Sequence, residues 1–117
     1  MISHLVLFRP HRDLPNHERD HLLNAFERAV RDIPSVRGVR AGKRVRFGAG
    51  YDRAAPELAE FLVAIDFDDL SGLQAYLEHP VHVELGERFG RACADSLIYD
   101  FAVTEDASAI RALFDAE

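Results

Sequence analysis

Residues 75–85 read A-Y-L-E-H-P-V-H-V-E-L and divide the second half of the chain into two helices. Pro80 lacks a backbone N–H and disfavours a helical conformation in the residue before it, so one helix should end near His79. Proline is tolerated in the first turn of a helix, so a second helix can begin at Pro80. The same stretch contains Tyr76 and His82, which can exchange protons with a ligand. It therefore sets the path of the chain and supplies candidates for a functional site.

Strand and helix patterns flank this stretch on both sides. Residues 58–67 alternate in a way that predicts a strand, after which Asp68 or Asp69 can cap a short helix. Beyond Pro80 a helix is expected to about residue 95. Residues 97–103 (L-I-Y-D-F-A-V) then predict another strand.

The first half of the chain repeats this alternation. Residues 2–8 (I-S-H-L-V-L-F) predict a strand that is apolar on both faces. Either Asp13 or Asn16 can cap a helix whose apolar residues recur at helical spacing until Pro34 ends it. A second strand is predicted over residues 36–47. The next segment, residues 48–56, contains two glycines and a proline and is predicted to be a loop.

The resulting order, β-α-β-β-α-β, predicts an α+β ferredoxin-like domain: a four-stranded antiparallel sheet with helices on one face. If His4 points toward the helices, Leu5 and Leu7 lie on the uncovered face. Burying this apolar face against its own copy predicts a homodimer formed through the sheet. The tail, residues 104–117, has a weaker helical pattern.

Composition excludes several classes of protein. The chain has 117 residues, 48% of them hydrophobic, which is sufficient for one globular core. No apolar run is long enough to cross a bilayer, so no membrane partner is expected. A net charge of −6 argues against nucleic acid as a partner. The single cysteine, Cys93, fits a reducing cytoplasm.

Two charged motifs are interpreted as solvated surface. His17 to His21 read H-E-R-D-H, which matches the zinc-protease pattern H-E-x-x-H. These histidines lie nearly opposite the apolar stripe of their helix and lack an evident third ligand, so a solvated face is favoured over a metal site. A basic run is likewise read as a strand face rather than an anion site; its members are Arg37, Arg40, Lys43, Arg44 and Arg46.

His82 is the best candidate for chemistry. Leu85 and Phe89 follow it at helical spacing, so its imidazole lies on an apolar face where burial favours the neutral, basic form. The break at Pro80 can bring Tyr76 toward His82, and His4 can point at the same space. The competing interpretation is a core histidine bonded to backbone beside a tyrosine that anchors its helix. Metal binding by His79 and His82, three residues apart, is a minor alternative.

These features together resemble the stress-responsive dimeric α/β-barrel family. The resemblance rests on I-S-H-L-V-L-F-R at the start, I-P-S-V-R-G-V-R-A-G-K-R-V at 33–45, Y-L-E-H-P-V-H-V at 76–83 and the closing L-I-Y-D-F. It covers residues 1–103, which it identifies as the barrel domain, with 104–117 as a C-terminal tail. Compared with a plant cyclase of the family, the 48–56 loop is longer and the tail is an addition.

The resemblance implies a function as well as a fold. The plant member closes a linear polyketide by an intramolecular aldol reaction in a pocket between sheet and helices. For this chain we expect a hydrophobic pocket and neither a cofactor nor a metal. Carried over, His82 is the general base, Tyr76 stabilises the oxyanion, and His4 binds the substrate, a small hydrophobic carbonyl compound. The alternatives are a non-catalytic, stress-related ligand-binding dimer and, less favoured, a cofactor-free monooxygenase.

Overall fold

The computed structural model describes residues 1–115 of the chain as four strands and five helices. The strands are β1 (Ile2–Pro10), β2 (Gly38–Lys43), β3 (Phe61–Phe67) and β4 (Cys93–Ala102). The helices are α1 (Asn16–Asp32), α2 (Gly50–Ala54), α3 (Leu70–Glu78), α4 (Pro80–Ala92) and α5 (Ala109–Asp115).

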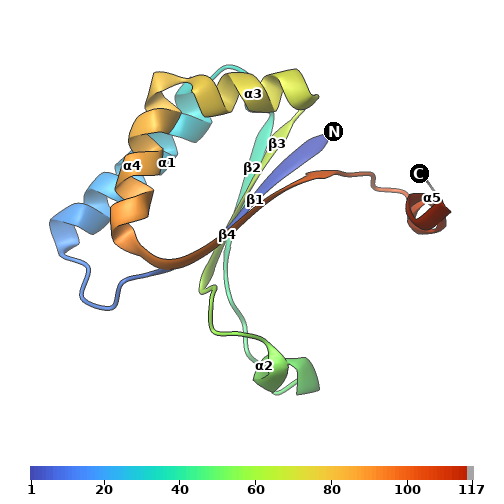
Figure 1. Ribbon diagram of the computed structural model, residues 1–117, viewed down its shortest axis with the longest axis horizontal. Helices are drawn as coiled ribbons and strands as arrows, with labels where there is room; N and C mark the ends of the chain where they lie inside the picture. The colour runs from blue at the N-terminus through green and yellow to red at the C-terminus, as the bar shows by residue number, and fades with distance from the viewer. Residues whose placement is uncertain (116–117) are drawn as a thin grey trace.

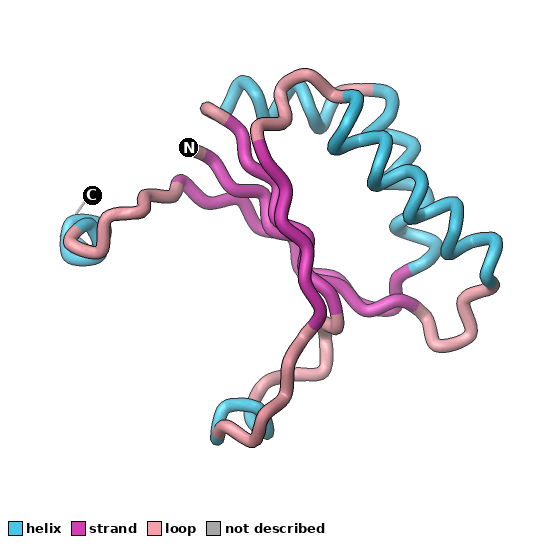
Figure 2. Tube along the Cα trace, turned by 180° about the vertical axis from the view of Figure 1, so that it is seen from behind, coloured by secondary structure: helices cyan, strands magenta, loops and turns pink. Residues whose placement is uncertain are grey.

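The four strands form one antiparallel sheet in the order β2-β3-β1-β4. Helices α1 and α4 pack side by side and, with α3, cover one face of the sheet (Figures 1 and 2). The predicted β-α-β-β-α-β order and ferredoxin-like architecture are therefore confirmed. Within residues 1–115, no helix is long and apolar enough to cross a membrane.

The core lies between the sheet and these three helices. Its most completely buried side chains come from β3, α1 and α3, and include Ile65, Phe67, Ala29 and Tyr76, each at most 1% exposed. Strand β1 is central, because it pairs with both β3 and β4. Its even-numbered side chains face the helices, as predicted.

The opposite face of the sheet, which we call the outer face, carries apolar side chains from three strands. Leu5 and Leu7 of β1 are partly buried on it. On β4, Tyr99 and Phe101 are 52% and 49% exposed. A contiguous exposed apolar surface of this kind marks an interaction site.

Several predicted boundaries were wrong by a few residues. Strand β2 ends at Lys43 rather than Phe47, and Val45 and Phe47 are each 74% exposed. The alternation in the sequence of β2 continues past Lys43. Lys43 already pairs with Phe61, the first residue of β3, so the later residues of the predicted strand have no partner strand. Helix α4 ends at Ala92, three residues early, because β4 already pairs with β1 from Cys93.

The helix ends follow their sequence signals only in part. The N-cap of α1 is Pro15, which makes no side-chain cap hydrogen bond, so the expected cap by Asp13 or Asn16 was wrong. The cap of α3 was predicted correctly, because the carboxylate of Asp69 accepts a hydrogen bond from the backbone N–H of Gly72 at 3.0 Å.

The expected loop between β2 and β3 contains a short helix, α2. The carboxylate of Asp52 accepts hydrogen bonds from the backbone N–H groups of Phe47, Gly48 and Ala49. Gly48 has a φ of 92°, a conformation that glycine adopts without steric cost. The carboxylate thereby satisfies N–H groups that the chain reversal leaves free, and this part of the chain stands away from the sheet (Figure 1).

Candidate active site

The break between α3 and α4 places Tyr76 and His82 against each other. His79 is both the C-cap of α3 and the N-cap of α4, and its Nδ1 accepts a hydrogen bond from the backbone N–H of Val81 at 3.1 Å. Pro80 occupies the first turn of α4. The chain turns here, and the ring centroids of Tyr76 and His82 lie 4.7 Å apart at an interplanar angle of 54°.

His4 reaches the same cluster from the centre of the sheet. Its ring lies edge-on to Tyr76, with 5.8 Å between centroids, and the Phe67 ring lies 5.2 Å from Tyr76 on another side. His4 is 4% exposed and Tyr76 is 1% exposed. The structure thus brings together the three residues singled out in the sequence.

A backbone contact fixes the tautomer of His82. Its Nδ1 lies 3.1 Å from the carbonyl oxygen of Leu77. A carbonyl oxygen can only accept, so Nδ1 carries the proton, and Nε2 of the neutral ring has a free lone pair. Burial lowers the pKa of His82, an effect opposed by the hydrogen bond to Leu77 and assisted by nearby His4. The ring is therefore neutral and able to accept a proton at Nε2.

Tyr76 has the complementary property. Burial raises the pKa of its phenol to about 12, so the hydroxyl keeps its proton at any physiological pH. Within residues 1–115, no hydrogen-bond partner is found for this hydroxyl. A protonated phenol without a protein partner is suited to donate a hydrogen bond to a ligand oxygen.

Asp100 is a member of the cluster that sequence reasoning missed. Its Oδ1 lies 2.6 Å from Nδ1 of His4, and the two residues are direct partners in the pairing of β4 with β1. The carboxylate accepts from Nδ1, which directs Nε2 of His4 away from Asp100. The available signal was the alternation along 97–103, which places Asp100 on the same side of its strand as Ile98.

An apolar cavity lies on the helix side of the sheet. It has a volume of about 270 Å³ and is bounded by α1, β1, β2 and β3. Its lining includes Leu23, Phe26, Val30, Val39 and Phe61. Tyr76, His82 and His4 are not part of that lining. Phe8 links the two regions, because it lines the cavity and lies on the same side of β1 as His4.

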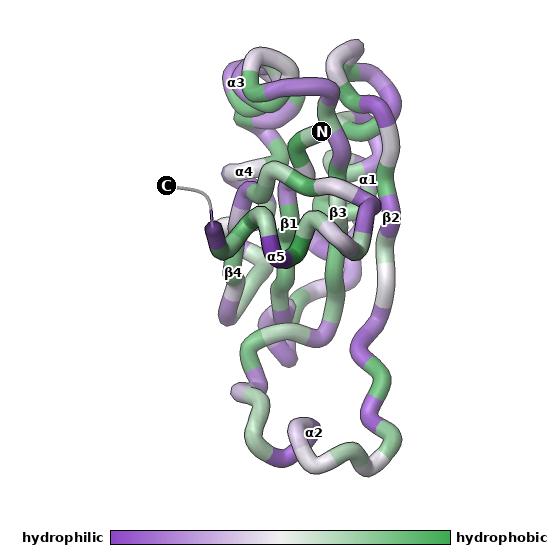
Figure 3. The backbone as a smooth tube through the Cα atoms, turned by 90° about the vertical axis from the view of Figure 1, so that its right-hand side faces the viewer, coloured by the Kyte–Doolittle hydropathy of each residue, from purple (hydrophilic) through white to green (hydrophobic). Residues whose placement is uncertain are grey.

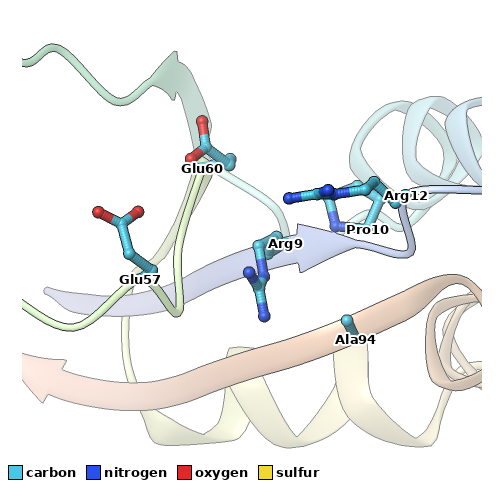
Figure 4. A pocket seen from close by; sticks show the side chains of 6 residues that line it. All are labelled: Arg9, Pro10, Arg12, Glu57, Glu60 and Ala94. Atoms are coloured by element: carbon cyan, nitrogen blue, oxygen red, sulfur yellow. The ribbon is translucent and has the colours of Figure 1, made fainter.

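A larger cavity, of about 600 Å³, lies beside Arg9 and Pro10 at the end of β1, and four of its six lining residues are charged (Figure 4). Arg9 and Arg12 line it from one side, and Glu57 and Glu60 from the segment before β3. Arg9 pairs with Asp95, and both glutamates pair with Arg46. These charges compensate one another, so we assign no anion site to this cavity.

The H-E-x-x-H motif is exposed as expected, whereas in the basic run the Arg44 side chain is only 17% exposed and pairs with Glu57. His17 and His21 lie on the solvent side of α1, and Nδ1 of His21 accepts a hydrogen bond from Arg88 at 3.1 Å. Within the part of the chain that the structure describes, no three histidine, cysteine or acidic residues are grouped to hold a metal ion. Burial raises the pKa of the Cys93 thiol to about 11, so the group stays protonated and weakly nucleophilic at neutral pH.

Comparison with known proteins agrees with this architecture. The sequence is 22% identical over 100 residues to olivetolic acid cyclase of Cannabis sativa, covering 86% of this chain and 94% of that protein. The structure is similar to hydroxynitrile lyase from Passiflora edulis, with a TM-score of 0.75 and 17% identity over 90% of this chain and 94% of the other. It also resembles a dimeric ferredoxin-like protein from Thermobifida fusca, with a TM-score of 0.66 and 24% identity over 87% and 90% of the chains.

A family model provides the broadest match. The model of the stress-responsive A/B barrel domain aligns with residues 2–103, which include all four strands and helices α1 to α4. Y-x-x-H-P-x-H, the most specific part of the resemblance seen in the sequence, lies within this match. The chain therefore belongs to the stress-responsive α/β-barrel domain family.

Proposed function

We propose that this protein catalyses acid/base chemistry on a small hydrophobic carbonyl compound, with His82 as general base and Tyr76 as hydrogen-bond donor. The observation that carries the proposal is the contact between these rings, 4.7 Å apart, in which one side chain is poised to accept a proton and the other to donate a hydrogen bond. Environments that separate two titratable groups in this way are typical of paired catalytic residues.

The proposed reaction is an aldol-type cyclisation. Nε2 of His82 removes a proton from the carbon next to a carbonyl, and the electron pair moves onto the carbonyl oxygen to give an enolate. The Tyr76 hydroxyl hydrogen-bonds that oxygen and stabilises its charge. The enolate carbon then bonds to a second carbonyl carbon of the same molecule, and the resulting alkoxide takes the proton back from His82.

His4 is proposed to position the substrate. Asp100 holds Nδ1 of His4, so Nε2 is the atom left to contact a ligand. The side chain is buried and cannot turn freely, which suits an orienting role. The cavity of about 270 Å³ bounded by α1, β1, β2 and β3 is proposed to accept the apolar part of the compound, with Phe8 between the two regions.

The similar proteins support this class of reaction. One is named a cyclase and another a hydroxynitrile lyase. A residue pair that accepts a proton and donates a hydrogen bond next to a carbon bearing oxygen is suited to both kinds of reaction.

The second candidate function is ligand binding without catalysis. One observation favours it: the apolar cavity does not include Tyr76, His82 or His4 in its lining. A ligand could then be held under α1 without contacting the proton-transferring groups. In this case the ring cluster would stabilise the junction of α3 and α4 only.

We further propose that the protein is a homodimer formed through the outer face. The exposed apolar side chains of β4 and the dimeric description of the Thermobifida fusca relative support this arrangement.

A cytoplasmic location is part of the proposal, since Cys93 is the only cysteine and a reducing compartment would keep it free.

The test of the catalytic proposal is turnover of a linear poly-β-keto substrate by the wild type, His82→Ala and Tyr76→Phe. We expect the wild type to form a cyclic product and His82→Ala to lose at least about 100-fold in rate. His17→Ala, which removes an exposed histidine from α1, is the matched control and should keep the full rate. Identical products with and without protein, together with saturable binding of the substrate, would support the non-catalytic function.

A further inference from the structure

The C-terminal arm, residues 104–115, extends beyond the family domain and packs little against the rest of its own chain. It leaves the sheet at the end of β4 and carries α5 to the outer side, away from α1, α3 and α4 (Figures 1 and 2). Viewed from that side, α5 crosses in front of the strands (Figure 3).

The helix in this arm exposes its apolar side chains. Ile110, Leu113 and Phe114 occur at helical spacing on one face, and they are 59%, 62% and 86% exposed. A helix of seven residues is not stable alone in water, because nucleation costs more than so few hydrogen bonds return. The arm therefore requires a surface on which this face is buried.

Its own sheet does not supply that surface. A cavity of about 450 Å³ lies between the arm and the outer face, lined by Leu5 and Phe101 on the sheet side and by Ile110 and Leu113 on the arm. Side chains from another molecule can occupy this space. The occupant should be apolar, like the cavity walls.

The exposed surface is large enough for an interface with a second copy of the chain. The accessible surface is 8147 Å², whereas a monomeric protein of this size exposes about 6,400 Å². The excess, about 1,700 Å², is more than the roughly 800 Å² that each partner contributes to a standard interface. The radius of gyration is 15.9 Å, against about 13 Å for a compact chain of 117 residues.

Charge indicates where on the partner the arm would bind. The arm carries three carboxylates, on Glu105, Asp106 and Asp115, and one cation, Arg111. The stretch from β2 through α2, residues 38–54, carries five cations and one carboxylate. Arg44 and Arg46 already pair with Glu57 and Glu60, whereas Arg40, Lys43 and Arg53 form no ion pair within residues 1–115. Lys43 and Arg44, at the end of the edge strand β2, are among the residues that line an apolar cavity of about 440 Å³, which Leu7 and Leu97 line from the outer face.

We infer that the arm of one protomer docks on the β2–α2 edge of a second copy, with Ile110, Leu113 and Phe114 covering apolar side chains of the partner. The acidic residues of the arm then lie close to the partner's basic stretch. In a two-fold dimer the contact forms twice, so each protomer both gives and receives an arm. The inference concerns assembly and does not depend on the proposed chemistry.

The first test compares dimerisation of the full chain with that of Ile110→Asp/Phe114→Asp, using sedimentation of folded protein over a concentration series. We expect the dissociation constant to rise at least tenfold. Leu70→Asp is the matched control: Leu70 is 68% exposed at the start of α3, on the far side of the sheet, and its variant should dimerise like the wild type. A monomeric wild type, or an arm variant within twofold of the wild type, would overturn the inference.

The second test uses Lys43, the only lysine in the chain. A zero-length carbodiimide cross-linker applied to a subunit-exchanged mixture of ¹⁴N- and ¹⁵N-labelled protein should join Lys43 to Glu105, Asp106 or Asp115. We expect about half of the linked peptides to be isotopic hybrids, because partners are drawn at random. Lys43→Arg should remove these products. Linked peptides of a single isotope only would mean that the arm folds onto its own chain, and would contradict the inference.

Discussion

The rings of Tyr76 and His82 are in contact although they belong to two different helices. Six residues separate them in sequence, and their centroids lie 4.7 Å apart. On one continuous helix, residues six apart would point about 120° away from each other. Because α3 ends at His79 and α4 begins at Pro80, the two rings are not held at that angle and come into contact.

The depressed pKa of His82 predicts how stability depends on pH. Because the folded state disfavours the protonated ring, the unfolded chain binds more protons as pH falls through about 6.5. The contribution of this group to the free energy of unfolding is therefore fully present above pH 6.5 and is lost at lower pH. NMR titration of the imidazole should give a pKa below 6.5 for His82. Chemical unfolding at pH 7.5 and 5.5 should show a smaller difference for His82→Gln than for the wild type, and equal differences would contradict the assignment.

Replacing Tyr76 by phenylalanine should distinguish the contribution of its ring to stability from the contribution of its hydroxyl to catalysis. The ring is 1% exposed and packs against Phe67, so Tyr76→Phe keeps its shape and should change the free energy of unfolding by less than about 1 kcal/mol. Loss of the hydroxyl proposed to stabilise the oxyanion should lower kcat by about 10² to 10³. Tyr76→Ala, in contrast, should cost about 3–5 kcal/mol through the cavity it leaves. Unchanged kcat in Tyr76→Phe would exclude the hydroxyl from the reaction.

The pair formed by His4 and Asp100 should contribute measurably to stability. Asn at position 100 keeps the shape of the carboxylate and removes its charge, so we expect Asp100→Asn to cost about 1–2 kcal/mol. A double-mutant cycle with His4→Asn, measured by urea unfolding, isolates the interaction. Additive effects of the two substitutions would show that the contact adds nothing beyond strand pairing.

A charge on the outer face should separate the proposed dimer without unfolding the protomer. Tyr99 is 52% exposed and lies on that face of β4, so Tyr99→Asp leaves the core intact and places a carboxylate where the partner's sheet is expected. Light scattering should then give a monomer mass at micromolar concentration, with a far-ultraviolet circular dichroism spectrum like that of the wild type. A dimer mass for this variant would place the interface elsewhere.

The architecture could be predicted because each element carries a local signal. Pro34 and Pro80 end helices, and the alternation in β1 and β3 predicts which side chains face the core. Boundaries depend on partners that no local pattern reveals. Val45 and Phe47 continue the alternation of β2, yet β3 begins too late to pair with them. α1 begins after Pro15 without the side-chain cap that Asp13 or Asn16 could have supplied.

The side chains of the candidate site could be selected from the sequence, whereas their surroundings could not. His82 and Tyr76 stand out because they flank a helix break on apolar faces. Asp100 does not stand out, because its importance comes from its contact with His4 on the neighbouring strand. The two residues are 96 positions apart in sequence. The apolar cavity could not be located either, since its walls come from α1 and three strands whose spacing depends on the packing of α1.

The central position of β1 also constrains the order in which the chain can fold during synthesis. The first strand to leave the ribosome needs both β3 and β4 as neighbours, and its pairing with β4 joins Ile2 to Ala102. Contacts this distant in sequence form slowly, because closing so long a loop costs entropy before any bond is gained. A nascent chain therefore holds an apolar strand without its full set of partners until β4 has been synthesised, which leaves that strand open to non-native pairing for most of translation.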